Sequence, residues 1–113
     1  MDQSTTLAEL KQLVAAFVAE RDWAKFHSPK NLSAAIAIEA AELMELFTWL
    51  SEAESDAAAA GPVKQAAADQ LADVAIFAIA FANRCDIDLA QAIADKLAKN
   101  RAKYPAEEYR GRV

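Results

Sequence analysis

The scarcity of chain-turning residues most constrains the fold of this chain. Only two glycines and three prolines occur among its 113 residues, too few for the many turns of a β-sandwich or β-barrel. Hydrophobic residues make up 55% of the chain, and alanine, which favours helices, is common among them. We therefore expect an all-α fold: a bundle of four antiparallel helices at residues 4–22, 32–52, 63–84 and 88–102, completed by oligomerisation.

Local signals mark the ends of these helices. Ser28-Pro29 is typical of a helix start, because proline is tolerated at the first helical position. Gly61-Pro62 is a strong stop signal, so we expect residues 53–62 to form a short, low-complexity connector. We expect one domain at residues 1–105, followed by a loosely held polar tail at residues 106–113.

The third expected helix is apolar on more than one side. Such a helix lies at the centre of a bundle or faces a partner subunit. Because so small a bundle offers few neighbours, we expect a homodimer or a homotetramer. The apolar residues of this helix include Leu71, Val74, Ile76, Phe77, Ile79 and Phe81.

Charge and cysteine content limit the classes of function. A formal net charge of -5 argues against a general nucleic-acid-binding surface, which would be basic. Cys85 is the only cysteine, so no intramolecular disulfide is possible and a reducing compartment is indicated. No signal peptide is recognisable, and no apolar run reaches the roughly 20 residues of a membrane span. We expect a cytoplasmic protein without membrane or nucleic-acid partners.

Three glutamates interrupt the apolar sequence of the second expected helix. Glu39, Glu42 and Glu45 are spaced three residues apart, so Glu39 and Glu42 lie about 60° apart and one turn along a helix. Isoleucine and leucine residues flank them, which indicates that this side of the helix approaches the core. Carboxylates are costly there unless a positive group meets them. The alternative is a solvated helix face.

A second polar turn lies at the matching level of the third helix. Asp69, Gln70 and Asp73 stand about as far from the connector as Glu42 does, and a short connector makes the two helices antiparallel neighbours. Oxygen ligands on two facing helices, without histidine or cysteine, favour Mg²⁺ or Mn²⁺ over Zn²⁺. The predicted metal ligands are Glu39, Glu42, Gln70, Asp73 and Asp69.

Aromatic and basic residues suggest a nucleotide ligand. Trp23, Phe26 and Trp49 offer surfaces on which a base can stack. The segment at residues 23–31 could equally plug the end of the bundle. The far end of the fourth helix is basic and would attract phosphates. A metal, cations and aromatic rings together suggest attack of water on a phosphoryl group, with Glu42 or Glu45 orienting or deprotonating the water.

Four motifs carry a family resemblance. In their order and spacing they resemble the MazG-like nucleotide pyrophosphohydrolases, most closely the dCTP pyrophosphatase branch of the all-α NTP pyrophosphatases. The similarity extends from about Arg21 to Pro105. The motifs are Phe26–Leu32, Glu39–Trp49, Leu71–Val74 and Lys96–Pro105.

The resemblance implies a house-cleaning hydrolase. Such enzymes cleave a (deoxy)nucleoside triphosphate, here dCTP or a modified pyrimidine dNTP, to a monophosphate and pyrophosphate. They use Mg²⁺ held by a Glu-x-x-Glu and a Glu-x-x-Asp, and they form dimers or tetramers. The implied catalytic residues are Glu39, Glu42, Glu45 and Asp73. The implied nucleotide-binding residues are Trp23, Phe26, His27, Asn31, Trp49, Phe77, Lys96, Asn100, Lys103 and Tyr104.

The chain departs from the family pattern at one position. Gln70 stands where the family has the first glutamate of Glu-x-x-Asp. A glutamine carbonyl can ligate a metal, but one negative charge is lost, and Asp69 is an alternative source of that charge. Gln70 also leaves open a catalytically weak nucleotide-binding bundle. A plain helical interaction module is the third hypothesis.

Overall fold

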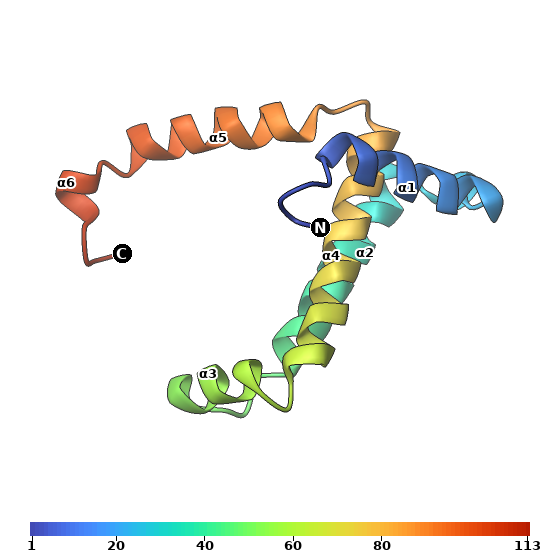
Figure 1. The fold of residues 1–113 in the computed structure, drawn as a ribbon. Helices are drawn as coiled ribbons and strands as arrows, with labels where there is room; N and C mark the ends of the chain where they lie inside the picture. The colour runs from blue at the N-terminus through green and yellow to red at the C-terminus, as the bar shows by residue number, and fades with distance from the viewer.

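The computed structural model describes all residues 1–113, and it contains helices joined by turns, without a strand. The all-α expectation is confirmed. Figure 1 shows the helices in chain order. They are α1 (Leu7–Glu20), the short 3₁₀ helix η1 (Ala24–Phe26), α2 (Pro29–Glu45), α3 (Glu52–Ala60), α4 (Lys64–Arg84), α5 (Leu89–Lys103) and α6 (Ala106–Tyr109).

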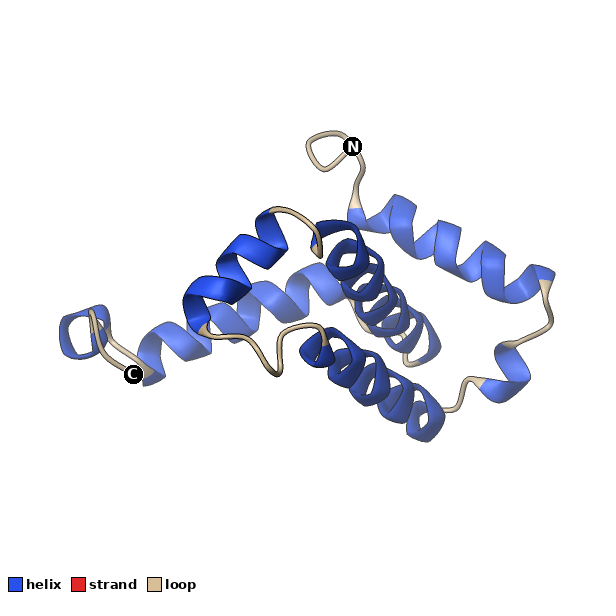
Figure 2. Ribbon diagram, turned by 90° about the horizontal axis from the view of Figure 1, so that it is seen from below, coloured by secondary structure: helices blue, strands red, loops and turns tan.

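Helices α2 and α4 form the centre of the molecule. They run antiparallel and side by side, and α1 packs across α4 (Figures 1 and 2). Val14 of α1, Leu32 of α2 and Ile79 and Ala80 of α4 form the buried cluster where these helices meet. Leu32 is the largest fully buried side chain, with 1% of its surface exposed. The expected antiparallel pairing of the second and third helices is confirmed.

Several expected helix boundaries are wrong. Helix α2 begins at Pro29 and ends at Glu45 instead of continuing to residue 52. Residues 53–62, expected to be a short, low-complexity connector, instead form most of α3. The expected loose tail contains the short helix α6.

A capping box explains why α3 forms. Ser51 Oγ accepts a hydrogen bond of 3.1 Å from the Glu54 backbone N–H, and the Ser51 backbone N–H donates to Glu54 Oε1 at 2.9 Å. These bonds satisfy backbone groups at the helix start, and the alanines that follow favour its continuation. The Ser51 backbone N–H also holds the pKa of the Glu54 carboxyl below its ordinary value. This contribution to stability is present above the ordinary pKa and is lost as pH falls through the lowered one.

Aspartates take the place of glycine where α1 and α4 end. Asp22 and Asp86 both have a φ of 52°, a left-handed conformation that aspartate tolerates better than most residues. The Trp23 backbone N–H then donates to Val18 O at 3.1 Å, and an equivalent bond of 2.9 Å follows Asp86. This is the hydrogen-bond pattern of a Schellman motif. The chain therefore ends these two helices without a glycine.

Helix α5 forms as expected but extends away from the other helices (Figure 1). Its Ile93 and Leu97 are 51% and 48% exposed. The radius of gyration is 16.9 Å, against about 13 Å for a compact chain of this length. The chain exposes 8709 Å², about 2,600 Å² more than a compact protein of its mass. One chain alone therefore does not close a four-helix bundle.

Helix α4 meets the length and composition criteria of a membrane span. Its mean hydropathy is 1.3 over 18 residues, although acidic residues interrupt the apolar run as expected from the sequence. The core helix of a soluble protein passes the same test. Here α4 packs against α1, α2 and α3, and it carries Asp69 and Asp73.

Candidate active site

The side chain of Gln70 connects the two central helices at the level of the glutamates. Its Nε2 donates a hydrogen bond of 3.0 Å to Glu42 Oε2 and a shorter one to Glu39 Oε2. The same nitrogen lies 3.4 Å from the backbone oxygen of Glu39. The predicted alignment of the two polar turns is therefore confirmed.

The geometry of the helix pair explains this meeting. Glu42 lies one turn before the end of α2, and Gln70 lies within the second turn of α4. Because the two helices are antiparallel, these depths bring the residues to the same level. The expected alignment holds even though α3, rather than a short connector, separates the helices.

Three other predicted acidic residues lie near this contact, and each has different surroundings. Asp73 is exposed and lies one turn after Gln70 on α4. Asp69 Oδ1 instead accepts a hydrogen bond of 2.9 Å from Gln65 Nε2, one turn earlier on α4. It therefore does not take the place of Gln70 beside the glutamates. Glu45 is exposed in the last turn of α2.

The donor set suits a hard divalent cation. Glu39 and Glu42 each direct one oxygen at the same amide nitrogen, so their carboxylates already converge on a partially positive group. Carboxylate and amide oxygens are the ligands that Mg²⁺ and Mn²⁺ prefer. No group of three or more histidine, cysteine, aspartate or glutamate side chains is placed to hold a metal ion. The glutamate pair therefore depends on Gln70, or on movement of Asp73, for further ligands.

A second group of predicted site residues lies at the N-terminal end of α2. Asn31 Nδ2 donates to Phe26 O at 3.0 Å and so ties η1 to α2. His27 lines a pocket of about 220 Å³ with residues of α1 and α4. Asn83 and Arg84 also line this pocket. Neither was predicted from the sequence, although a polar pair at the end of an apolar helix was the available signal.

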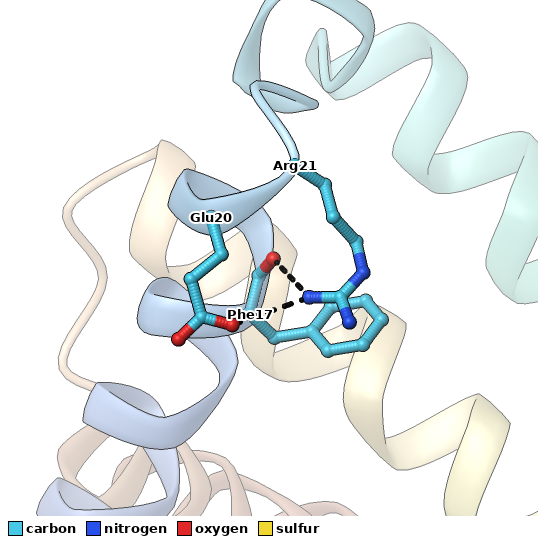
Figure 3. Close-up of polar contacts among 3 residues, drawn as sticks. All are labelled: Phe17, Glu20 and Arg21. Carbon is cyan, nitrogen blue, oxygen red and sulfur yellow. Dashed lines mark hydrogen bonds and ion pairs between the residues drawn. The ribbon is translucent and has the colours of Figure 1, made fainter.

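Figure 3 shows how the end of α1 holds Arg21 beside Phe17. Arg21 Nη1 donates to Phe17 O at 3.1 Å and to Glu20 Oε2 at 3.3 Å. Its guanidinium lies 3.8 Å from the centre of the Phe17 ring. Trp23 packs edge-on against the same ring, with the centroids 5.7 Å apart, and keeps 42% of its surface exposed. Trp23 is therefore held in place while it still presents an aromatic surface.

The other predicted nucleotide-binding residues lie elsewhere in the chain. Trp49 follows the end of α2 and is 92% exposed. Phe77 is partly buried and packs against the buried cluster. The remaining residues lie on α5 or directly after it, on the helix that points away from the bundle (Figure 1): Lys96, Asn100, Lys103 and Tyr104. Within one chain, the glutamate pair thus lies apart from the predicted cationic groups of α5 (Figure 1).

Known proteins resemble this chain in sequence and in fold. Residues 34–112 match the MazG-like family. The chain is 45% identical over 107 residues to dCTP pyrophosphatase 1 of Rattus norvegicus, and 43% identical over 102 residues to that of Homo sapiens. These alignments cover 94% and 89% of this chain but 63% and 60% of the relatives. The chain therefore spans less than two thirds of the length of these curated relatives.

The fold also matches a solved structure. The crystal structure of a pyrophosphatase from Archaeoglobus fulgidus aligns with a TM-score of 0.81 and 34% sequence identity. The alignment covers 87% of this chain and 91% of that one. The arrangement of helices described above is therefore one that a pyrophosphatase uses.

Proposed function

Because this chain belongs to the MazG-like family, we propose that it is a metal-dependent nucleoside triphosphate pyrophosphohydrolase. It cleaves a dNTP between the α and β phosphates, releasing a dNMP and pyrophosphate. The meeting of Glu39 and Glu42 with Gln70 across α2 and α4 carries this proposal, because it gathers oxygen ligands for a phosphate-bound cation. The relatives named dCTP pyrophosphatase 1 support dCTP or a modified pyrimidine dNTP as the substrate.

The carboxylates of the site have distinct proposed roles. Glu39, Glu42, Asp73 and the carbonyl oxygen of Gln70 hold Mg²⁺, or Mn²⁺ in its place. A bound divalent ion would neutralise charge that develops on the phosphates. Glu45 is exposed one turn beyond Glu42, where its carboxylate is free to accept the proton of the attacking water.

Aromatic and cationic residues complete the proposed nucleotide site. Trp23, His27 and Trp49 contact the base, with Phe26 and Asn31 shaping the same end of α2. The cationic side chains of α5 bind the phosphates, and Lys103 and Tyr104 already lie together, with the Lys103 Nζ 5.3 Å from the ring centre. We place the reaction in the cytoplasm, as a house-cleaning activity on surplus or non-standard nucleotides.

We propose that the enzyme is a homodimer or a homotetramer. The excess exposed surface is about 2,600 Å² per chain, or about 5,200 Å² for two chains, which is at the upper end of the total area that obligate dimers bury. An entirely apolar groove of about 430 Å³ lies between α1 and α4, and only 17% of the apolar window of α4 is buried. A second copy would cover these surfaces. It would also bring α5 against a neighbour.

The alternative is a nucleotide-binding bundle with weak catalysis. Gln70 favours this alternative, because it leaves the metal site with one negative charge fewer than a glutamate would. Such a protein would bind a nucleotide and a cation but release pyrophosphate slowly.

A pyrophosphate-release assay across standard and modified dNTPs tests the proposed function. We expect Mg²⁺-dependent release, fastest with dCTP or a modified pyrimidine dNTP, and none in EDTA. A parallel thermal-shift series with dNTPs and Ca²⁺ reports binding, because ligands that bind only the folded state raise its stability. Thermal shifts without pyrophosphate release would favour the weak binder. The absence of both thermal shifts and pyrophosphate release would favour a plain helical interaction module.

Leu13→Asp is expected to dissociate the oligomer. Leu13 lines the apolar groove and is already 63% exposed in the single chain, so a charge there costs little unless a partner covers it. Gln12→Asp is the matched control, because residue 12 lies about 160° around α1 from Leu10 in the groove. Light scattering after size exclusion measures the mass. An unchanged mass for Leu13→Asp would place the interface elsewhere.

A further inference from the structure

We propose that the amide NH₂ group of Gln70 takes the place of the cation in the metal-free protein, and that this amide must rotate when the metal binds. This inference rests on the proposed function, because it concerns the same metal site. The amide of Gln70 is the only donor that the structure gives to both Glu39 and Glu42. In the metal-free protein this amide keeps the two carboxylates together. When the ion binds, the amide oxygen of Gln70 takes the place of the amide nitrogen beside Glu39 and Glu42.

The chemistry of the contact fixes which end of the amide faces the glutamates. Ionised carboxylates accept hydrogen bonds and cannot donate them, whereas the amide NH₂ carries two hydrogens. Two hydrogens match the two carboxylate oxygens, and the backbone oxygen of Glu39, at 3.4 Å, is the most distant of the three acceptors. The amide oxygen in that position would face two negative oxygens. The metal-free site therefore holds the NH₂ group inward.

A divalent cation reverses this preference. The positive ion repels the NH₂ group and attracts the carbonyl oxygen, which is an accepted ligand of Mg²⁺. Rotation about the last torsion of glutamine exchanges the two ends, and this torsion is broad and roughly two-fold. Gln70 is half-buried rather than locked in the core, so the exchange needs no movement of the backbone.

Neither a glutamate nor an apolar residue at position 70 could fill this role. A glutamate would add a third negative charge, which repels the pair without metal and attracts the ion when it is present. An apolar residue of similar length would leave the carboxylates without their donor. Compared with a glutamate, glutamine therefore stabilises the metal-free carboxylate pair and lowers the affinity of the site for the ion.

The direct test follows the side-chain amide of the wild-type protein by ¹H–¹⁵N NMR. The Gln70 NH₂ signals are identified by their loss in Gln70→Met. We expect them outside the usual range of exposed glutamine amides in EDTA, and we expect them to move on addition of Mg²⁺ without nucleotide. Signals at ordinary positions that Mg²⁺ leaves unchanged would overturn the proposal.

Variants test the energetic balance. In EDTA, Gln70→Met and Gln70→Glu are both expected to melt lower than the wild type, by about 4 °C or more. Gln70→Glu is expected to bind Mn²⁺ at least about tenfold more tightly, measured as the loss of the free-Mn²⁺ resonance in electron paramagnetic resonance. Gln65→Glu is the matched control, because it adds the same charge to α4 beside Asp69, about 140° around the helix from Gln70. Equal melting of Gln70→Met and wild type, or a metal response of Gln70→Glu that Gln65→Glu reproduces, would refute the role.

The wild-type release assay distinguishes this inference from the proposed function. Pyrophosphate release together with an unmoved Gln70 amide would overturn the role of Gln70 and leave the hydrolase intact. A moving amide without release would support the role of Gln70 and overturn the hydrolase.

Discussion

Asp73→Ala is expected to lower Mg²⁺-dependent pyrophosphate release by at least about 100-fold. Loss of residues that only support metal ligands already costs 10–100-fold in many metalloenzymes, and Asp73 is itself a proposed ligand. It is exposed and lies one turn after Gln70 on α4, so the substitution leaves no cavity in the core. A steady-state assay with dCTP, combined with a Mg²⁺ titration, measures the effect.

Asp69→Ala is the control for this experiment. Asp69 is also an exposed aspartate of α4, but its carboxylate is held by Gln65. We expect it to retain most of the activity. Undiminished pyrophosphate release by Asp73→Ala would contradict the assignment of the metal site. Equal losses in both variants would return Asp69 to the list of ligands.

Leu32→Ala is expected to cost about 3 kcal/mol of unfolding free energy, because truncating a buried leucine removes apolar contacts and leaves a cavity. Leu32 is 1% exposed and packs in the cluster that joins α1, α2 and α4. Denaturation with urea at one fixed protein concentration measures the loss. Glu39 and Glu42 lie on the same helix as Leu32 and keep their places while the protein is folded. Reduced activity is therefore expected only at temperatures where the variant begins to unfold.

Leu32→Met serves as the comparison, because it keeps nearly the same volume and should cost less than about 1.5 kcal/mol. A loss of under about 1 kcal/mol for Leu32→Ala would show that the junction of the three helices is not the main source of stability.

The sequence predicts the centre of the molecule better than its margins. The expected third helix at residues 63–84 agrees with α4 at Lys64–Arg84, because Gly61-Pro62 and a long apolar pattern mark its bounds. The facing of the two polar turns was also predictable, since antiparallel helices and a rise of 1.5 Å per residue place residues at known depths. The contacts of Gln70 confirm that level.

The misses have separate physical causes. The sequence predicts a connector in place of α3, because the alanines there resemble low-complexity sequence. In the structure, Ser51 and Glu54 form the capping box that starts this helix. The course of α5 was not predictable from its apolar stripe, which indicates that a partner exists but not which chain supplies it. For the same reason the predicted contacts of Lys96, Asn100 and Tyr104 with a nucleotide stay predictions.

The outward course of α5 ties the folding of this chain to its concentration. An isolated helix of 15 residues is marginal in water, and α5 makes few contacts with its own chain. Its backbone amides are therefore expected to exchange hydrogen with solvent far faster than those of α2 and α4, and to become protected as subunits associate. A newly synthesised subunit of the proposed oligomer would then lack an ordered set of the proposed phosphate-binding cations until it meets another. The proposed activity would then rise with concentration more steeply than the amount of protein.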